Sequence, residues 1–320
     1  MMPQRSHLVG FGSYLPKKIV TNDDLAHYVD TSHEWIYERT GIVQRHISDE
    51  QETAVYMGTQ AALKALEFAG EKAEEVDAIF VATSTPDQIF PSTAARIQAE
   101  LSIKHGFAMD ITAACSGFVY ALATANAFIL SGQIKNALVI GTEVYSRLLD
   151  WSDRRTCVLF GDGAGAVLVK AKNKEGGILS SHLHSDGSIG DILYVDGALG
   201  IKDASGYIRM NGREVFRHAV MRLSEVVDEA LKSNGMTKES VNWLVPHQAN
   251  LRIIKAMGKK LGLMDSQVIV TVDRHANTSA ASIPLALDEA IRGGRIKKDD
   301  TILLEALGGG LTWGAILAIY

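Results

Sequence analysis

Short apolar runs alternate along the chain with longer segments of helical pattern. Residues 76–86 (VDAIFVATSTP) and 241–250 (VNWLVPHQAN) each indicate a buried strand that ends in polar residues and precedes a helical segment. Polar residues also predict helix N-caps at Asn22 and at Thr31 or Ser32. Strands that alternate with helices are typical of mostly parallel sheets covered by helices, so the pattern predicts an α/β fold.

The same order of elements occurs twice. Residues 109–135 and 272–297 both run from a predicted strand through a polar turn into a helix rich in small residues, and both end in G-x-I-K. Each is followed by a strand, a glycine-rich turn and a last strand (137–143 with 161–169; 301–307 with 308–319). The repetition predicts two related halves, 1–173 and 174–320, that pack together without a linker.

Composition narrows the class of protein. Of the 320 residues, 47% are hydrophobic and 22% are charged, and the formal net charge is −5. A negative chain is a poor general binder of nucleic acid, so no such partner is expected. The N-terminus lacks a secretory signal pattern, and the most apolar stretch, 117–130, is too short to span a bilayer. We expect a soluble cytoplasmic protein with no membrane partner.

The two cysteines, Cys115 and Cys157, lie in different settings. Their spacing is not that of a metal site, so neither a metal nor a disulfide is expected. Cys157 lies in TCVLF, which indicates a small apolar residue in a buried strand. Cys115 lies at the start of an apolar helix, whose unpaired N–H groups favour a thiolate and can hold an oxyanion. The sequence therefore makes Cys115 a candidate nucleophile.

Two polar residues of the second half are candidate partners for Cys115. His247 follows the predicted strand WLVP, and Asn277 lies in the turn before the second half's own buried helix. If the halves are related by a pseudo-twofold axis, these strand ends and helix starts converge on one site. The alternative for each residue alone is an ordinary loop histidine and a helix-capping asparagine.

Five ordered motifs carry a resemblance that extends over nearly the full length. They are ACSGFVYAL, FGDGAGA, VPHQANLRI, HANTSAAS and GGGLTWG, joined by DTSHEWIYERTGI near the N-terminus. Together they closely resemble the β-ketoacyl-acyl-carrier-protein synthase III family, the initiating condensing enzymes of bacterial fatty acid synthesis. The resemblance implies a thiolase-like αβαβα fold and a homodimer. It also implies condensation of a short acyl-CoA with malonyl-acyl carrier protein, with coenzyme A thioester as a substrate and no cofactor.

The resemblance also implies roles for individual residues. Cys115, His247 and Asn277 match the catalytic triad, and the backbone N–H groups of Cys115 and Gly309 match the oxyanion hole. The positions expected to hold coenzyme A and its pantetheine arm are Trp35, Arg39, Arg154, Gly212 and Asn250. The positions expected to dock the acidic carrier protein are Arg217, Arg252, Lys259 and Lys260.

Three positions bear on the primer acyl group. Phe90 resembles the residue that reaches across the dimer to close the acyl pocket, which favours a short primer such as acetyl. Tyr145 is bulkier than the aliphatic residue often found at its position, whereas Leu307 replaces a phenylalanine of many relatives and opens space. Acetyl is the predicted primer, although these volumes act in opposite directions.

Other classes of protein fit the motifs less well. A degradative thiolase needs a second cysteine near the C-terminal glycines, and an elongating synthase needs a second histidine where Asn277 stands. A plant-type polyketide synthase is usually longer and lacks the GGGLTWG ending. GDGAGA precedes a strand rather than a helix, which argues against a Rossmann nucleotide site. A related condensing enzyme of secondary metabolism and a non-catalytic module that binds acyl-CoA or carrier protein remain as alternatives.

Overall fold

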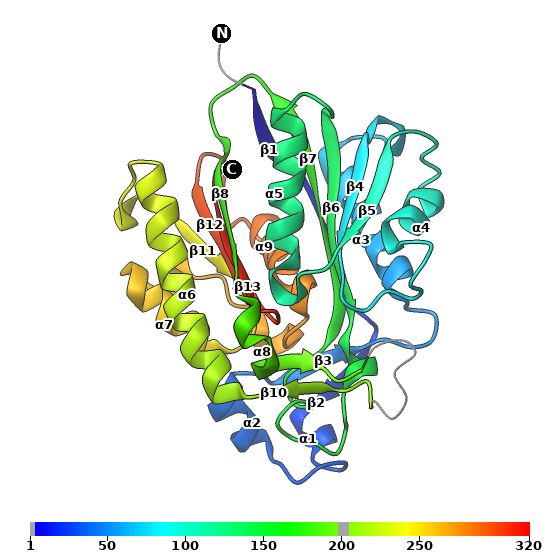
Figure 1. The fold of residues 1–320 in the computed structure, drawn as a ribbon, viewed down its shortest axis with the longest axis vertical. Helices are drawn as coiled ribbons and strands as arrows, with labels where there is room; N and C mark the ends of the chain where they lie inside the picture. The colour runs from blue at the N-terminus through cyan, green and yellow to red at the C-terminus, as the bar shows by residue number, and fades with distance from the viewer. Residues whose placement is uncertain (1–3, 198–204) are drawn as a thin grey trace.

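The computed structural model describes residues 4–197 and 205–320, and two β-sheets form the centre of this part (Figure 1). The first sheet has the strand order β1 (Arg5–Tyr14), β7 (Asp162–Lys172), β6 (Asn136–Val144), β4 (Ala78–Ala82) and β5 (Phe107–Ile111). The second has the order β11 (Trp243–Pro246), β12 (Thr301–Gly308), β13 (Thr312–Ile319) and β8 (Gly177–Ser185). Two small sheets pair β2 (Lys18–Thr21) with β3 (Gln44–Ile47) and β9 (Leu193–Val195) with β10 (Ile208–Met210).

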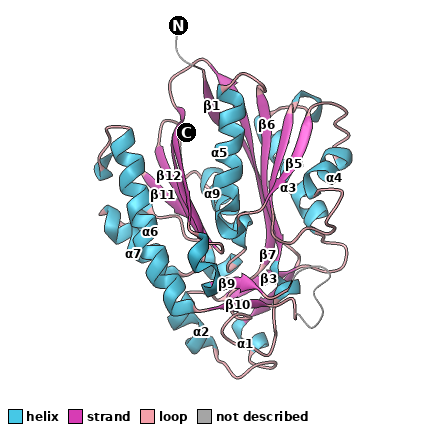
Figure 2. Cartoon of the chain, in the orientation of Figure 1, coloured by secondary structure: helices cyan, strands magenta, loops and turns pink. Residues whose placement is uncertain are grey.

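Helices lie between the two large sheets and on both outer faces. Between the sheets, α5 (Gly117–Leu130) and α9 (Ser282–Arg292) share one core with side chains of both sheets. Outside the first sheet lie α3 (Ala54–Ala69) and α4 (Thr93–Glu100), and outside the second lie α6 (Gly212–Ser233) and α7 (Leu251–Leu261). Figure 2 shows the same alternation of helices and strands. The predicted αβαβα layering is confirmed.

The other helical segments are short. They are the helices α1 (Asn22–Leu25), α2 (His33–Thr40) and α8 (Val272–His275), and the 3₁₀ turns η1 (Ala73–Glu75), η2 (Ala114–Ser116), η3 (Tyr145–Leu148), η4 (Gly187–Ile192), η5 (Lys238–Ser240), η6 (Asp265–Gln267) and η7 (Ser279–Ala281). In the described ranges, every helix is too short or too polar to cross a membrane.

α5 occupies the middle layer because it is apolar around most of its circumference. Phe118, Leu122 and Ile129 are all fully buried, and most of the helix is buried with them, apart from a stripe near its C-terminal end that exposes Ala127 and Leu130. α6 instead buries one stripe, through residues such as Leu223 and Val227, and leaves its other face polar. The burial of α5 carries its N-terminus, and the cysteine before it, into the centre of the molecule.

The expectation of mostly parallel sheets is wrong. Only β4–β5, β4–β6 and β11–β12 pair in parallel within the two large described sheets, whereas β1–β7, β6–β7, β12–β13 and β13–β8 are antiparallel. The glycine turn between β12 and β13 is too short for the crossover that a parallel pair requires. The repeated pattern of strand, glycine turn and strand therefore indicated antiparallel pairs rather than parallel ones.

Three local predictions also need correction. Cys157 is fully buried as expected, but it lies in a series of turns rather than in a strand. Residues 272–275 form the short helix α8 instead of a strand. The N-cap of α1 is Thr21 rather than Asn22, because the Thr21 hydroxyl accepts from the Asp24 N–H and the Asp24 carboxylate accepts from the Thr21 N–H. Ser32 caps α2, as predicted.

The expected boundary after residue 173 falls in the connection between β7 and β8. Each large sheet draws all its described strands from one side of that boundary. The interpretation of the chain as two pseudo-symmetric halves stays a prediction.

Candidate active site

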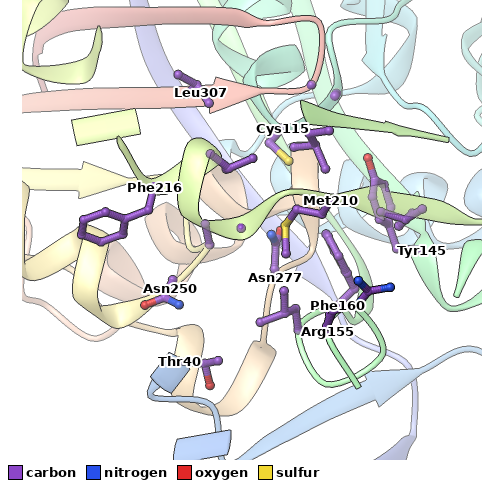
Figure 3. Close-up of a pocket in the computed structure, with 18 of the residues that line it drawn as sticks. Thr40, Cys115, Tyr145, Arg155, Phe160, Met210, Phe216, Asn250, Asn277 and Leu307 are labelled. Atoms are coloured by element: carbon purple, nitrogen blue, oxygen red, sulfur yellow. The ribbon is translucent and has the colours of Figure 1, made fainter. Parts of the chain in front are cut away.

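Cys115, His247 and Asn277 line one cavity of about 610 Å³. They come from three separate elements: the turn η2 before α5, the end of β11, and the loop between α8 and η7. Figure 3 shows Cys115 and Asn277 facing this space, with Tyr145, Phe160 and Leu307 around it. The predicted convergence of the three candidate residues is present, and their roles stay predictions.

The glycine turn between β12 and β13 approaches the backbone of Cys115 closely. A Cβ atom on Gly308 would lie 2.6 Å from the Cys115 nitrogen, so only glycine fits there. Thr312 closes the other side of the turn, because its hydroxyl contacts the Ser116 hydroxyl at 2.8 Å and donates to the Ala113 carbonyl oxygen at 3.1 Å. Gly309 lines the cavity beside Cys115, where an oxyanion hole was predicted.

Burial determines the protonation state of Cys115. The side chain is 6% exposed, and burial raises the pKa of the thiol to about 12. The Ser279 hydroxyl and the Cys115 backbone N–H oppose this rise in pKa, and the Glu143 carboxylate adds to it. The expectation that the helix start lowers this pKa is wrong, because desolvation outweighs the favourable N–H groups. The resting sulfur is a thiol and has to lose its proton during attack.

His247 is held as a neutral imidazole. Burial lowers its pKa to about 3. Its ring Nδ1 lies 2.6 Å from the Ser282 Oγ, which also accepts the Gln248 backbone N–H at 3.3 Å. The backbone N–H of His247 donates to the Glu305 carbonyl at 2.8 Å. Because Ser282 occupies Nδ1, Nε2 is the ring nitrogen left for the cavity.

Hydrogen bonds to both the side chain and the backbone of Asn277 fix its orientation. The side-chain oxygen accepts the Ser279 N–H at 2.8 Å. The backbone N–H donates to the Leu159 carbonyl at 2.9 Å, and the backbone carbonyl accepts the Gly161 N–H at 3.0 Å. With its oxygen engaged, the carboxamide can offer its NH₂ group to the cavity, and this donor does not titrate.

Backbone strain marks the turns that carry the candidate triad. Ala114, next to Cys115, has a φ of 46°, and Ala276 and Ser279, on either side of Asn277, have φ values of 57° and 50°. Residues with a Cβ rarely adopt this left-handed region, and such conformations cluster at functional sites.

The predicted coenzyme A residues lie on the same cavity. The guanidinium carbons of Arg39 and Arg154 are 4.4 Å and 5.0 Å from the centre of the Trp35 ring. Arg154 also donates to the Asp30 carbonyl at 2.8 Å. Asn250 caps α7 and donates to the Arg39 carbonyl at 3.0 Å, and Gly212 is the first residue of α6.

Several predicted residues lie elsewhere. Phe90 is 83% exposed and does not line the cavity within the described chain. The four cations of the predicted docking set are on α6 and α7, and two of them have carboxylate neighbours. Arg217 pairs with Glu214 at 2.7 Å, and the Lys260 ammonium lies 3.8 Å from Asp228. Arg252 and Lys259 are exposed on α7.

Comparison with known proteins identifies the family. Residues 109–187 match the family described as 3-oxoacyl-[acyl-carrier-protein (ACP)] synthase III, and residues 231–320 match its C-terminal counterpart. A β-ketoacyl-[acyl-carrier-protein] synthase III of Acidiphilium cryptum is 63% identical over 98% of this chain and 99% of its own length. The chain belongs to the synthase III family.

Relatives with solved structures share the fold of this synthase III. The 3-oxoacyl-[acyl-carrier-protein] synthase III of Aquifex aeolicus has a TM-score of 0.94 and 51% identity, with 98% of this chain and 100% of that chain covered. The priming β-ketosynthase of the R1128 polyketide pathway has a TM-score of 0.93 and 34% identity, with 100% and 98% covered.

Sequence reasoning missed the groups that support the candidate triad of this synthase III. Ser279 and Ser282 lie within the quoted motif HANTSAAS, but nothing local indicated that one contacts Asn277 and the other His247. Glu143 was also missed. It is fully buried on β6, and its carboxylate accepts from the Thr85 hydroxyl at 2.6 Å and the Ser84 N–H at 3.0 Å. Burial raises the pKa of Glu143 to about 7.

Proposed function

We propose that this synthase III condenses acetyl-CoA with malonyl-acyl carrier protein to give a 3-oxoacyl-acyl carrier protein, CO₂ and coenzyme A. The reaction class follows from the family, whose members are condensing acyltransferases that initiate fatty acid synthesis. The observation that carries the proposal is the meeting of Cys115, His247 and Asn277 on one cavity.

The first half-reaction is acyl transfer to Cys115. The neutral imidazole of His247 accepts the thiol proton at Nε2 as the sulfur attacks the thioester carbonyl. The backbone N–H groups of Cys115 and Gly309 stabilise the oxyanion. Collapse of the tetrahedral intermediate expels the coenzyme A thiolate, which takes the proton back from His247 and leaves an acyl-enzyme.

The second half-reaction uses the same imidazole as a hydrogen-bond donor. Loss of CO₂ from the malonyl thioester forms an enolate, whose oxygen receives hydrogen bonds from His247 Nε2–H and the Asn277 NH₂. Removing one donor of this kind costs about 3–4 kcal/mol of transition-state stabilisation. The enolate carbon attacks the acyl-Cys115 carbonyl, and the expelled Cys115 thiolate takes a proton from solvent. Because the Ser282 hydroxyl can accept from or donate to Nδ1, it is compatible with both roles of His247.

Cations beside the cavity support the proposed substrates. Arg39 and Arg154 can pair with coenzyme A phosphates, and Trp35 offers a ring for stacking on adenine. We define the docking surface as the four predicted cations together with Lys255, which is exposed on α7 between Arg252 and Lys259. α7 begins directly after Asn250, which lines the cavity, so a carrier protein bound there can deliver its thioester to Cys115.

A homodimer is the proposed assembly. β5 is the edge strand of the first sheet, and Phe90 and its neighbour Ile89 are exposed at 83% and 63%. An exposed apolar side chain beside an open sheet edge supports a contact with a second copy, in which Phe90 closes the partner's acyl pocket. The enzyme is proposed to act in the cytoplasm without a metal or other cofactor.

A second candidate is priming of a secondary-metabolite pathway. The likeness to the R1128 priming β-ketosynthase favours it, at 34% identity over the full chain. The higher identity to synthase III relatives favours the fatty acid role. Assays with carrier proteins of the two kinds of pathway distinguish the two roles, because each predicts a preferred malonyl donor.

The test of the proposal is intact-protein mass spectrometry after separate exposure to acetyl-, propionyl- and isobutyryl-CoA. We expect an acetyl adduct on the wild type and on Cys157→Ala, the matched control at the other buried cysteine, but none on Cys115→Ala. We expect Asn277→Ala to form the adduct and to lose malonyl-carrier-protein decarboxylation by about 100-fold. An adduct on Cys115→Ala would remove the nucleophile assignment, and normal decarboxylation by Asn277→Ala would remove that donor.

A further inference from the structure

Tyr145 connects the wall of the cavity to the turn that carries Asn277. It follows β6, is 6% exposed, and lines the cavity together with Cys115 (Figure 3). Its ring stacks on Phe160, with centroids 5.1 Å apart and an interplanar angle of 26°. Its phenol oxygen accepts a hydrogen bond from the Ser279 hydroxyl at 3.0 Å. The Tyr145 side chain is therefore held by Phe160 at its ring and by Ser279 at its hydroxyl.

Both contacts of Tyr145 lead to Asn277. Ser279, which binds the phenol, also holds the Asn277 side-chain oxygen through its N–H at 2.8 Å. Phe160, which stacks on the ring, forms a β-bridge with Asn277. The bridge is made by the two residues next to Phe160, whose backbone groups bond the Asn277 N–H and carbonyl. Tyr145 thus contacts Ser279, which holds the Asn277 carboxamide, and Phe160, whose two neighbours in the chain hold the Asn277 backbone.

We infer that Tyr145 is a positioning residue for Asn277, in addition to the role already expected of its ring as the wall that limits the primer acyl group beside Cys115. This inference rests on the proposed function. The ring occupies space that a smaller residue would leave to a longer or branched acyl chain. The hydroxyl orients Ser279, so the carboxamide of Asn277 presents its NH₂ group to the enolate oxygen.

The protonation state of Tyr145 suits this role. Burial and the nearby Glu143 carboxylate raise the pKa of Tyr145 well above its usual value, so the group remains a neutral phenol. A neutral phenol accepts from Ser279 without placing a charge next to the reacting sulfur.

The ring and the hydroxyl can be tested separately with Tyr145→Phe and Tyr145→Leu. Tyr120→Phe is the matched control, because the Tyr120 hydroxyl donates to the His184 carbonyl at 2.7 Å and Tyr120 does not line the cavity. Three readouts are compared with the wild type: acetyl transfer to Cys115, decarboxylation of malonyl-carrier protein, and the ratio of kcat/KM for isobutyryl-CoA to that for acetyl-CoA. Melting temperatures are recorded for every variant.

Each part of the inference predicts its own result. Tyr145→Phe should acylate within about twofold of the wild type and lose decarboxylation by about 10-fold, because a slightly misplaced donor is costly. Its primer ratio should not change, since the ring remains. Tyr145→Leu should raise the isobutyryl-to-acetyl ratio by about 10-fold or more, the usual effect of one or two methyl groups in an apolar pocket. Tyr120→Phe should match the wild type in all three readouts.

Other results would overturn the inference. Equal losses of acylation and decarboxylation in Tyr145→Phe, or no loss of either, would remove the positioning role. An unchanged primer ratio in Tyr145→Leu would remove the wall. If Tyr145→Leu fails to fold, Tyr145→Met takes its place, and an unchanged primer ratio in that variant would equally remove the wall. Absence of any acetyl adduct on the wild type would instead refute the proposed function, which separates the two failures.

Discussion

At the scale of single residues, burial rather than the helix start controls the chemistry of the site. Cys115 is a thiol and His247 a neutral imidazole, and desolvation is the largest cause of both shifted pKa values. A neutral base on the same cavity as a protonated thiol can begin the proposed reaction without a charged pair in the resting enzyme. Ser282 holds the imidazole in place for this exchange.

This arrangement predicts an acylation rate that does not fall at mildly acidic pH. When pH falls, His247 stays unprotonated until its pKa of about 3, and when pH rises, Cys115 stays protonated until its pKa of about 12. Glu143, with a pKa of about 7, loses its charge as pH falls, and this loss favours the Cys115 thiolate. The rate of acetyl transfer at pH 5.5 should therefore be no lower than at pH 8, whereas an ordinary imidazole would lose about 10-fold at the acid end. The adduct is timed by quenched-flow mass spectrometry.

Controls keep this measurement specific to the site. Protein returned from pH 5.5 to pH 7.5 should recover its full rate, which excludes unfolding as a cause of any decline. A reversible fall with a midpoint near 6.5 would show that His247 titrates normally, and the neutral-base step would then have to be abandoned.

At the scale of elements, the site is built where strands end and helices begin. β5 leads into the turn before α5, β11 leads into His247, and the turn from β12 to β13 closes over the Cys115 backbone. Thr312 and Ser116 tie this last turn to the helix start through their hydroxyls. The oxyanion hole proposed for Cys115 and Gly309 therefore depends on a close approach between two backbones.

Gly308→Ala should separate those two backbones. The added Cβ would lie 2.6 Å from the Cys115 nitrogen and 2.9 Å from the Ala113 oxygen, so the turn has to move. We expect acetyl transfer to fall about 100-fold or more, as for loss of an oxyanion donor, with a lower melting temperature. Gly187→Ala is the control, because a Cβ there meets no atom within 4 Å and its φ is not in the left-handed region. A Gly308→Ala enzyme with wild-type acylation would contradict the proposed hole.

At the scale of the whole molecule, charge is distributed unevenly. The formal net charge is −5, yet α7, which begins beside the cavity, exposes Arg252, Lys255 and Lys259. The Arg252 guanidinium donates only to the Glu38 carbonyl in the described residues, so its charge is not cancelled by a carboxylate. A local positive surface on a negative protein can steer an acidic partner to one place.

Charge reversal on this docking surface should affect the second half-reaction alone. Lys259→Glu should raise KM for malonyl-carrier protein by about 10-fold at low salt, because the exposed charge acts on encounter, and less at high salt. Acetyl transfer from acetyl-CoA should stay within about twofold of the wild type. Lys174→Glu makes the same change in net charge at an exposed position in the connection after β7 and should alter neither reaction. Equal effects of the two substitutions would point to net charge rather than to docking on α7.

Much of the fold followed from local pattern. The apolar circumference of α5 predicted its burial. The polar end of the strand WLVP predicted where His247 would lie, and the turn before the second half's buried helix predicted where Asn277 would lie. The direction in which neighbouring strands pair could not be predicted from local pattern, because a buried strand has the same pattern of residues in parallel and antiparallel sheets. Cys157 shows the same limit, since TCVLF is as apolar in a buried turn as in a strand.

The sequence by itself determined which residues are candidates for the chemistry and that they lie near the ends of strands and the starts of helices, because periodicity, caps and motifs are local properties. Only the tertiary structure decided the protonation of Cys115 and His247, the engagement of Ser279 and Ser282, and the position of Tyr145 between the acyl chamber and Asn277. Those features depend on burial and on neighbours that lie far apart in the chain, and folding alone brings them together.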